Sequence, residues 1–299
     1  MKILKKLMIG FTTAALMIGA CMGTVLAEES ESETQLQETT DTYNLLLIGV
    51  DRRDDTWYGN SDVMLLVTVN SEKEKIYMTS FMRDLYADIP GIGVRKLNAA
   101  CANGGAELCV QTIEENYQVQ IDNYAMVDFN SMAEIVDAIG GVDIEISEGE
   151  MEFINQNISG QYALAGKDDP VYLDHDGEVW LNGYQAVVYS RNRYTGSTSD
   201  FGRTERQRKL LTAIFEKVKS DYVETQSTST LQSLLSYTSH DLTGGDTLKL
   251  MMKASDWMNY KLEEVRVPFD DMYYSENEIL IPTDMAATRE KLQDILYRQ

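Results

Sequence analysis

Arginine is concentrated in one short segment of this chain. Residues 190–209 read SRNRYTGSTSDFGRTERQRK and contain Arg191, Arg193, Arg203, Arg206, Arg208 and Lys209, opposed only by Asp200 and Glu205. The chain as a whole is acidic, with a formal net charge of −22. Because guanidinium groups bind phosphate oxygens through paired hydrogen bonds, their clustering in an acidic protein indicates a site for a multiply charged anion.

Two aspartates are predicted to lie near another arginine. Residues 43–51 (YNLLLIGVD), 62–70 and 75–84 read as strands, and the turn SEKE joins the last two into a hairpin. In that hairpin, paired residue numbers sum to about 145, which places Asp62 opposite Arg83. Asp51 ends its own strand and reaches Asp62 across a loop of ten residues. Two carboxylates and an arginine are therefore expected at one end of a sheet.

This combination is typical of metal-assisted pyrophosphate chemistry. Mg²⁺ takes a few carboxylate oxygens together with phosphate oxygens, and arginines bind the remaining oxygens. Taken singly, the residues have plainer interpretations: Asp51 as a turn former, and Asp62 with Arg83 as a cross-strand ion pair. The convergence of several such groups favours the functional interpretation.

The elements that must position these groups form a mixed α/β pattern. Residues 124–146 read as strand, helix and strand, which predicts a mixed sheet covered by helices. Further helices are predicted at about residues 105–117 and from about Asp284, and residues 150–180 are predicted to be polar and irregular.

A long helix is predicted to begin near Arg203. Its buried stripe runs through Arg203, Gln207, Leu210, Ile214 and Val218. The stripe begins with polar groups, so Arg203 and Gln207 are expected to face a cleft. Off the stripe, Arg206 and Arg208 are expected to be solvated. Arg191 and Arg193 share a face if their segment is extended.

The N-terminal residues have the layout of an export signal. Lysines at positions 2, 5 and 6 precede an uncharged run from Leu7 to Ala27. Residues 1–27 are thus a cleaved signal, an uncleaved anchor or, through Cys21, a lipoprotein signal. Residues 28–42 are acidic and predicted to be a disordered stalk, leaving 43–299 as the folded domain. Export and acidity argue against binding nucleic acid.

Cysteine and histidine offer little chemistry. Cys101 and Cys109 are either a disulfide or two buried thiols. His175 and His240 are the only histidines, so zinc sites and histidine-based triads are disfavoured.

An ordered series of motifs resembles the LytR-CpsA-Psr family of bacterial cell-wall enzymes. The motifs are NLLLIGVDRR, SDVMLLVTVN, SFMRDLYADIPG, KLNAACANGG, VDFNSMAEIVDAIGGVDIEI, LNGYQAVVYSRNR and DFGRTERQRKLL. The resemblance is strong over about residues 43–219. Asn60 and Met82 depart from it, since the family usually has arginine and proline there.

The resemblance implies a fold and a set of site residues. The expected fold is an α-β-α sandwich whose central mixed sheet encloses an apolar tunnel for a polyprenyl chain. Asp51 and Asp62 would hold Mg²⁺, and either Asp62 or Asp84 would accept the acceptor's proton. The pyrophosphate would be bound by Arg53, Arg83, Arg191, Arg193 and Arg203, with Asp200 and Gln207 completing the site.

The activity implied by the resemblance is transfer of a glycopolymer from a polyprenyl pyrophosphate carrier to peptidoglycan. It would take place at the membrane surface, on the extracytoplasmic side, in cell-wall or capsule assembly. Two alternatives remain open: hydrolysis of the polyprenyl pyrophosphate, and a regulator that binds the lipid carrier without turnover.

Overall fold

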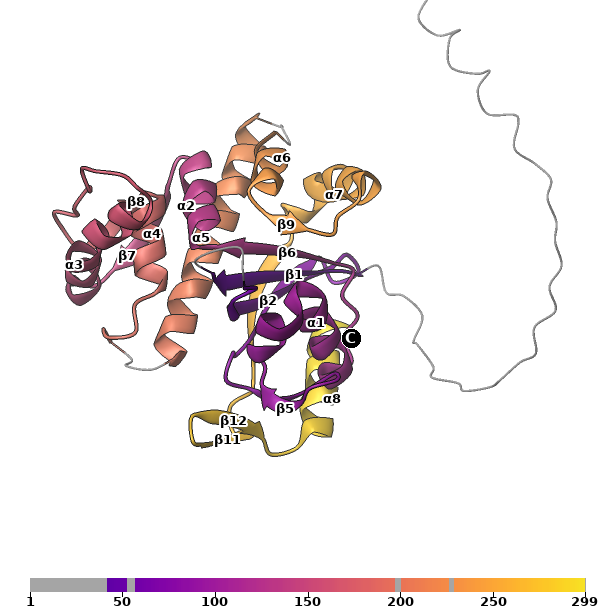
Figure 1. Cartoon of the computed structure of the whole chain (residues 1–299). Helices are drawn as coiled ribbons and strands as arrows, with labels where there is room; N and C mark the ends of the chain where they lie inside the picture. The colour runs from indigo at the N-terminus through magenta and orange to yellow at the C-terminus, as the bar shows by residue number, and fades with distance from the viewer. Residues whose placement is uncertain (1–41, 53–56, 197–199, 226–228, 299) are drawn as a thin grey trace, which may run out of the picture. The chain divides into compact units, whose positions relative to one another are not determined.

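The computed structural model describes residues 42–52, 57–196, 200–225 and 229–298 (Figure 1). The segments predicted as export signal or anchor and as stalk lie outside the described residues, except Thr42, which begins the first strand. Arg53 also lies outside them. Within the described ranges, no helix combines the length and the apolar character needed to span a membrane.

A six-stranded mixed sheet lies at the centre of the fold. Its strand order is β10-β3-β2-β1-β6-β9. The pairs β1–β6 and β3–β10 are parallel and the other pairs are antiparallel, which confirms the predicted mixed sheet. The strands are β1 (Thr42–Asp51), β2 (Asn60–Asn70), β3 (Lys75–Phe81), β6 (Asn123–Asp128), β9 (Ser239–His240) and β10 (Lys261–Val267).

The hairpin of β2 and β3 has the predicted register. Leu65 pairs with Ser80 and Leu66 with Thr79, so that each pair of numbers sums to 145. Between β1 and β2 the ladder is irregular: Gly49 pairs with Val63, whereas Val50 pairs with Ser61. Asp62 is therefore the extra residue of a β-bulge, a feature that turns a side chain to a new direction.

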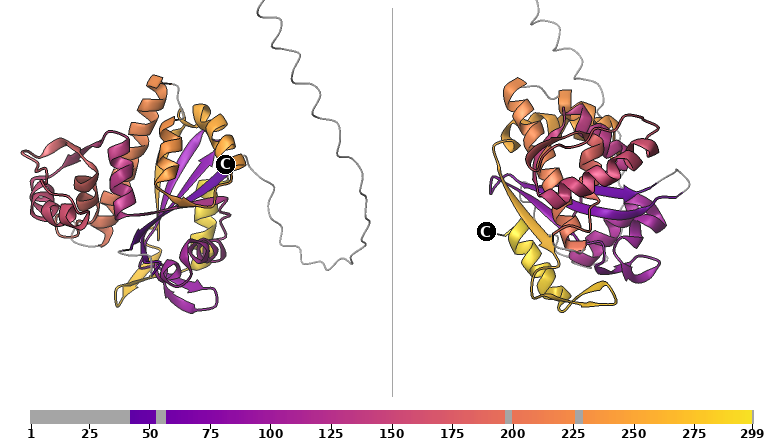
Figure 2. Two further views of the ribbon diagram at one scale, coloured as in Figure 1. Left: turned by 45° about the horizontal axis from the view of Figure 1, so that its top comes forward. Right: turned by 90° about the vertical axis from the view of Figure 1, so that its left-hand side faces the viewer.

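One face of the sheet is covered by α1 (Ala99–Tyr117) and α8 (Met285–Leu296), which lie side by side (Figures 1 and 2). Alternate residues of β1, including Leu46, Ile48 and Val50, are buried in this core together with Ile113 and Leu292. The period-two burial of β1 shows that its other side chains face the opposite layer.

The opposite face is covered by α2 (Phe129–Ala138), α5 (Asp200–Thr225) and α6 (Ser229–Ser236) (Figures 1 and 2). The predicted stripe of α5 is confirmed, since Arg203, Gln207, Leu210 and Val218 are buried and Ile214 is partly buried. The helix–sheet–helix sandwich expected from the resemblance is thus present.

A second hydrophobic core forms beyond this helical layer and corrects two predictions. Residues 150–180 are not irregular throughout, because α3 (Glu148–Leu164) fills much of the segment, with Ile154 and Ile158 buried. The strand after α2, β7 (Val142–Ile146), does not join the central sheet. It pairs with β8 (Gly177–Leu181) and packs with α3 and α4 (Gly183–Ser190).

Short elements complete the fold. Two small hairpins are formed by β4 (Tyr86–Ile89) with β5 (Gly93–Lys96), and by β11 (Tyr273–Glu276) with β12 (Ile279–Pro282). The helix α7 (Gly244–Trp257) lies next to β9 in Figure 1. The backbone N–H of Leu280 donates to the Asp84 carbonyl, which ties the second hairpin to the end of β3.

Candidate active site

Three of the predicted site residues meet at the end of the β2–β3 hairpin. Arg83 Nη1 donates to Asp62 Oδ1 at 2.8 Å, and Arg203 Nη1 lies 3.6 Å from Asp62 Oδ2. The Arg203 side chain is almost fully buried, at 2% exposed, whereas those of Arg83 and Asp62 remain 20% and 13% exposed. The Asp62 carboxylate thus links a buried guanidinium group, that of Arg203, to one that solutes can reach, that of Arg83.

The ladder between β1 and β2 places the backbone of Asp51 near that of Asp62. Asp51 pairs with Asn60 in the ladder, two residues before Asp62. Gly59 has φ +81°, and a Cβ built on it would lie 2.9 Å from the Asp51 carbonyl oxygen. Only glycine allows the chain to pass so close to Asp51 with this backbone. The predicted approach of Asp51 to Asp62 therefore has a defined backbone origin.

Asp84 is engaged by two cations. Lys96 Nζ donates to Asp84 Oδ1 at 2.7 Å, and Arg83 Nε lies 3.5 Å from Asp84 Oδ2. Lys96, Asp84, Arg83, Asp62 and Arg203 thus form a continuous row of alternating charges. In this row Asp84 orients Arg83 from the side opposite to Asp62.

An apolar cavity of about 210 Å³ opens from this cluster. It lies between the sheet and the helices α2, α5 and α6, with Leu47, Ala125 and Ile214 among its walls. Its polar lining residues are Asp62, Asp128, Ser190, Gln207 and Thr238. Asp62 therefore belongs both to the charged cluster and to the wall of the apolar cavity, and Gln207 lies on the same wall.

Asp128 is a site residue that the sequence analysis did not identify. It caps α2 by accepting a hydrogen bond from Ser131 N, and its Oδ2 lies 3.6 Å from Arg52 Nη2. Val50 pairs with Asp128 in the parallel ladder, so this aspartate ends its strand beside Asp51. The motif VDF repeats the strand-then-aspartate pattern of GVD, and that signal was available in the sequence.

Arg191 and Arg193 do not share a face of an extended segment. Arg191 is the C-cap of α4 and has helical dihedral angles. Its guanidinium carbon lies 4.5 Å from the centre of the Phe129 ring, which lines the cavity, and Nη1 donates to Gln161 Oε1 at 3.3 Å. Arg193 is exposed. Asp200 begins α5, but its side chain lies outside the described part of the chain.

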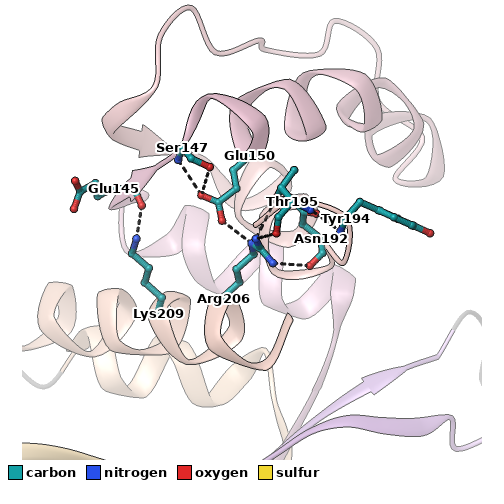
Figure 3. Close-up of polar contacts among 8 residues, drawn as sticks. All are labelled: Glu145, Ser147, Glu150, Asn192, Tyr194, Thr195, Arg206 and Lys209. Atoms are coloured by element: carbon teal, nitrogen blue, oxygen red, sulfur yellow. Dashed lines mark hydrogen bonds and ion pairs between the residues drawn. The ribbon is translucent and has the colours of Figure 1, made fainter. Parts of the chain in front are cut away.

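The expectation that Arg206 and Arg208 are solvated is wrong. Arg206 is buried, and its Nε donates to Glu150 Oε1 at 2.6 Å (Figure 3). Arg208 is partly buried, with Nε 3.4 Å from Glu264 Oε2. A helix can bury more than one face, and α5 packs on the second core as well as on the sheet layer.

Within residues 42–52, 57–196, 200–225 and 229–298, no group of three or more histidine, cysteine, aspartate or glutamate side chains is arranged as a metal site. Cys101 and Cys109 are free and buried rather than bridged. Burial raises the pKa of Cys101 to about 11 and that of Cys109 further, so neither thiol is poised as a nucleophile.

A family model, described as the LytR_cpsA_psr family, matches residues 16–294. The chain belongs to the LytR-CpsA-Psr family. This confirms the resemblance inferred from the motifs.

Several curated relatives are named "Polyisoprenyl-teichoic acid--peptidoglycan teichoic acid transferase TagU". The Enterococcus faecalis protein is 33% identical over 72% of this chain and 65% of its own length. The Bacillus cereus protein is 30% identical over 81% of this chain and 69% of its own length. The Biofilm regulatory protein A of Streptococcus mutans is 34% identical, but the match spans only 44% of that protein.

Solved structures share the fold of the LytR-CpsA-Psr chain described here. One, described as TagT bound to LI-WTA, has a TM-score of 0.66 and 26% identity, covering 92% of this chain and 99% of the other. A second, YwtF (TagT) with bound octaprenyl pyrophosphate lipid, has a TM-score of 0.64, 24% identity and the same coverage.

Proposed function

We propose that this protein transfers a glycopolymer from a polyprenyl pyrophosphate carrier to peptidoglycan, in the assembly of the cell wall or capsule. The observation that carries the proposal is the junction of two environments. The apolar cavity, suited to an isoprenoid chain, has Asp62 and Gln207 in its wall, and Asp62 is contacted by Arg83 and Arg203. A lipid pyrophosphate has the same two parts in the same order.

In this proposal the arginines bind the diphosphate. Arg83 and Arg203 are already held in place by Asp62, so little reorganisation is needed when phosphate oxygens arrive. Arg191, beside the cavity wall at Phe129, and the exposed Arg193 would approach from the α4 side. Arg53 and Asp200 keep the roles that the family resemblance implies.

Asp51 and Asp62 would hold Mg²⁺. Mg²⁺ is bound in proteins by one or two carboxylates together with substrate phosphates, and the donor set at the ends of β1 and β2 fits that requirement. Asp128, on the cavity wall at the end of the neighbouring parallel strand, adds a third carboxylate nearby. When bound, the ion neutralises charge on the diphosphate oxygens.

The proposed reaction is a phosphoryl transfer with a simple balance. An acceptor hydroxyl oxygen bonds to the sugar-linked phosphorus, and the bond from that phosphorus to the bridging oxygen breaks. Polyprenyl monophosphate leaves, and the hydroxyl proton passes to a carboxylate. Asp84 contacts both Lys96 and Arg83, and we assign it to orienting Arg83.

The proposed place of action is the extracytoplasmic face of the membrane, where lipid carrier and peptidoglycan meet. The N-terminal lysines and apolar run support export. The net charge of −22 supports a protein that does not bind nucleic acid.

One assay separates this function from its alternatives. Purified protein is given lipid-linked oligosaccharide labelled in the sugar, with Mg²⁺, with and without peptidoglycan. We expect label in the peptidoglycan fraction and release of polyprenyl monophosphate only when peptidoglycan is present. Release of labelled sugar phosphate to water without the acceptor would identify a hydrolase instead. Binding of the lipid without either product would identify a non-catalytic carrier-binding protein.

A further inference from the structure

Arg206 joins three separate segments of the chain (Figure 3). From α5 its Nε donates to Glu150 Oε1 at 2.6 Å, and its Nη1 donates to the carbonyl of Asn192 at 3.1 Å. Its Nη2 donates to the carbonyl of Thr195 and, at 3.1 Å, to Thr195 Oγ1. All three guanidinium nitrogens therefore donate hydrogen bonds to acceptors within the protein.

The segment that receives these hydrogen bonds is a compact turn around Asn192. The side chain of Asn192 is buried, and its Oδ1 accepts from the backbone N–H groups of Tyr194 and Thr195 at 2.9 and 3.3 Å. Its Nδ2 donates to Thr195 Oγ1 at 2.6 Å. Arg191 and Arg193 alternate with Asn192 along this turn, so its conformation sets where both arginines are presented.

The third segment is the first turn of α3. Glu150 Oε2 accepts from the backbone N–H and the hydroxyl of Ser147, at 2.9 and 3.0 Å, while Oε1 accepts from Arg206. A Cβ built on Gly149 would lie 3.3 Å from Thr195 Cγ2, so this turn of α3 also touches the Asn192 turn directly. The carboxylate of Glu150 is thus fixed on both sides.

We propose that Arg206 is a positioning residue that fixes the Asn192 turn, and thereby Arg191 and Arg193, relative to Arg203 on the same helix. The inference rests on the proposed function, in which these arginines share one diphosphate. Arg203 lies one turn before Arg206 and contacts Asp62. Arg206 thereby keeps Arg191 and Arg193, which follow α4, at a fixed distance from Arg203 on α5.

The geometry requires arginine at this position. The planar guanidinium fork reaches Glu150, Asn192 and Thr195 in three directions, whereas a lysine ammonium is a single point on a flexible stem. Arg206→Lys keeps the positive charge but loses most of the hydrogen bonds that Arg206 donates. The matched control is Arg208→Lys, because Arg208 lies two residues further along α5 and makes one ion pair of 3.4 Å.

The first measurement is limited proteolysis of the full-length protein by trypsin, followed by mass spectrometry. Cleavage after Arg193 is expected to be about tenfold faster or more in Arg206→Lys than in wild type, because the turn opens more often without the hydrogen bonds from Arg206. Cleavage after Lys261 in the same samples is an internal reference for global unfolding. Equal rates after Arg193 in the wild type, Arg206→Lys and Arg208→Lys would overturn the proposal.

The second measurement is a mutant cycle on the affinity for geranylgeranyl pyrophosphate. Arg206→Lys is expected to weaken binding about tenfold, because small displacements of charged groups are costly. In the background Arg191→Ala/Arg193→Ala, the same substitution is expected to have almost no further effect. A purely structural role predicts additive losses, and additivity would overturn the proposal.

The two measurements distinguish failure of the role proposed for Arg206 from failure of the proposed function. If wild-type protein binds no pyrophosphate, the proposed function fails, whereas proteolysis still decides whether Arg206 holds the turn. If the wild type binds pyrophosphate, and Arg206→Lys has the wild-type affinity and the wild-type rate of cleavage after Arg193, Arg206 does not position the turn. The proposed function then stands.

Discussion

Asp62 shows how far single residues could be predicted. Adding residue numbers across the SEKE turn placed it opposite Arg83, and the structure has that contact at 2.8 Å. The helical stripe predicted that Arg203 faces a cleft, and the structure places its Nη1 3.6 Å from Asp62 Oδ2. Lys96 was missed because its ion pair with Asp84 joins a small hairpin to the end of β3, and no local pattern fixes that docking.

Asp62→Asn is expected to lower turnover of lipid-linked substrate by about a hundredfold or more, because the variant loses charge at the centre of the arginine cluster. The Mg²⁺ concentration that gives half-maximal turnover should rise, because one of the two proposed carboxylate ligands is lost. The assay is release of polyprenyl monophosphate across a Mg²⁺ series. The matched control is Asp143→Asn, an exposed aspartate on β7. Equal activity in the two variants would contradict the assignment of Asp62.

Lys96→Met is expected to lower kcat/KM about tenfold by releasing Asp84, so that Arg83 is no longer held from both sides. Lys96→Arg should restore most of the activity. Arg95→Met changes an exposed neighbour on the same strand and should leave kcat/KM unchanged. If Lys96→Met lowers the melting temperature while kcat/KM per folded molecule stays at the wild-type value, Lys96 has no positioning role.

At the scale of elements, α5 was predicted correctly along one stripe and wrongly beside it. The period of Leu210, Ile214 and Val218 marked one buried face: Leu210 and Ile214 line the apolar cavity, and Leu210 and Val218 belong to the second core. That analysis gave the helix a single buried face, whereas α3 and the turn after α4 cover another and bury Arg206. The burial of a charged residue by a distant segment leaves no periodic signal in the helix itself.

Glu150→Gln tests the contact between α3 and α5 through its pH dependence. Burial alone would raise the pKa of Glu150, but hydrogen bonds from Ser147 and Arg206 outweigh it and lower the pKa below 4.5. A depressed folded-state pKa stabilises the fold above the unfolded pKa, and this stabilisation is lost as the pH falls through the folded pKa. At pH 7 the variant should lose about 1.5–3 kcal/mol of unfolding free energy.

The difference between Glu150→Gln and the wild type should shrink below about pH 4.5 and vanish at lower pH. Urea unfolding at a series of pH values measures it. Glu148→Gln, an exposed acid in the same turn, is the control and should change little at any pH. A difference that stays constant from pH 7 to pH 3 would show that the ion pair with Arg206 does not stabilise the fold.

At the scale of the whole molecule, the sandwich followed from the sequence, but its second core did not. The strand–helix–strand pattern of residues 124–146 predicted a mixed sheet covered by helices. The sheet is mixed, but its parallel pairs are β1–β6 and β3–β10, because β7 lies outside it. The polar composition of residues 150–180 concealed α3, although Ile154, Ile158 and Tyr162 recur every four residues, as one buried helix face requires. Which sheet a strand such as β7 joins depends on long-range packing, and strand propensity does not encode it.

The central claim is that the apolar cavity and the charged cluster are two parts of one site for a polyprenyl pyrophosphate. The most direct test is calorimetric binding, with Mg²⁺, of inorganic, geranyl, farnesyl and geranylgeranyl pyrophosphate to wild type and to Ala125→Met, which narrows the cavity. Each buried CH₂ contributes ~0.8 kcal/mol, so wild-type affinity should rise by more than tenfold per isoprene unit until the cavity is filled. Ala125→Met should reduce this gain and leave inorganic pyrophosphate unaffected. Affinity independent of chain length in the wild type would contradict the account.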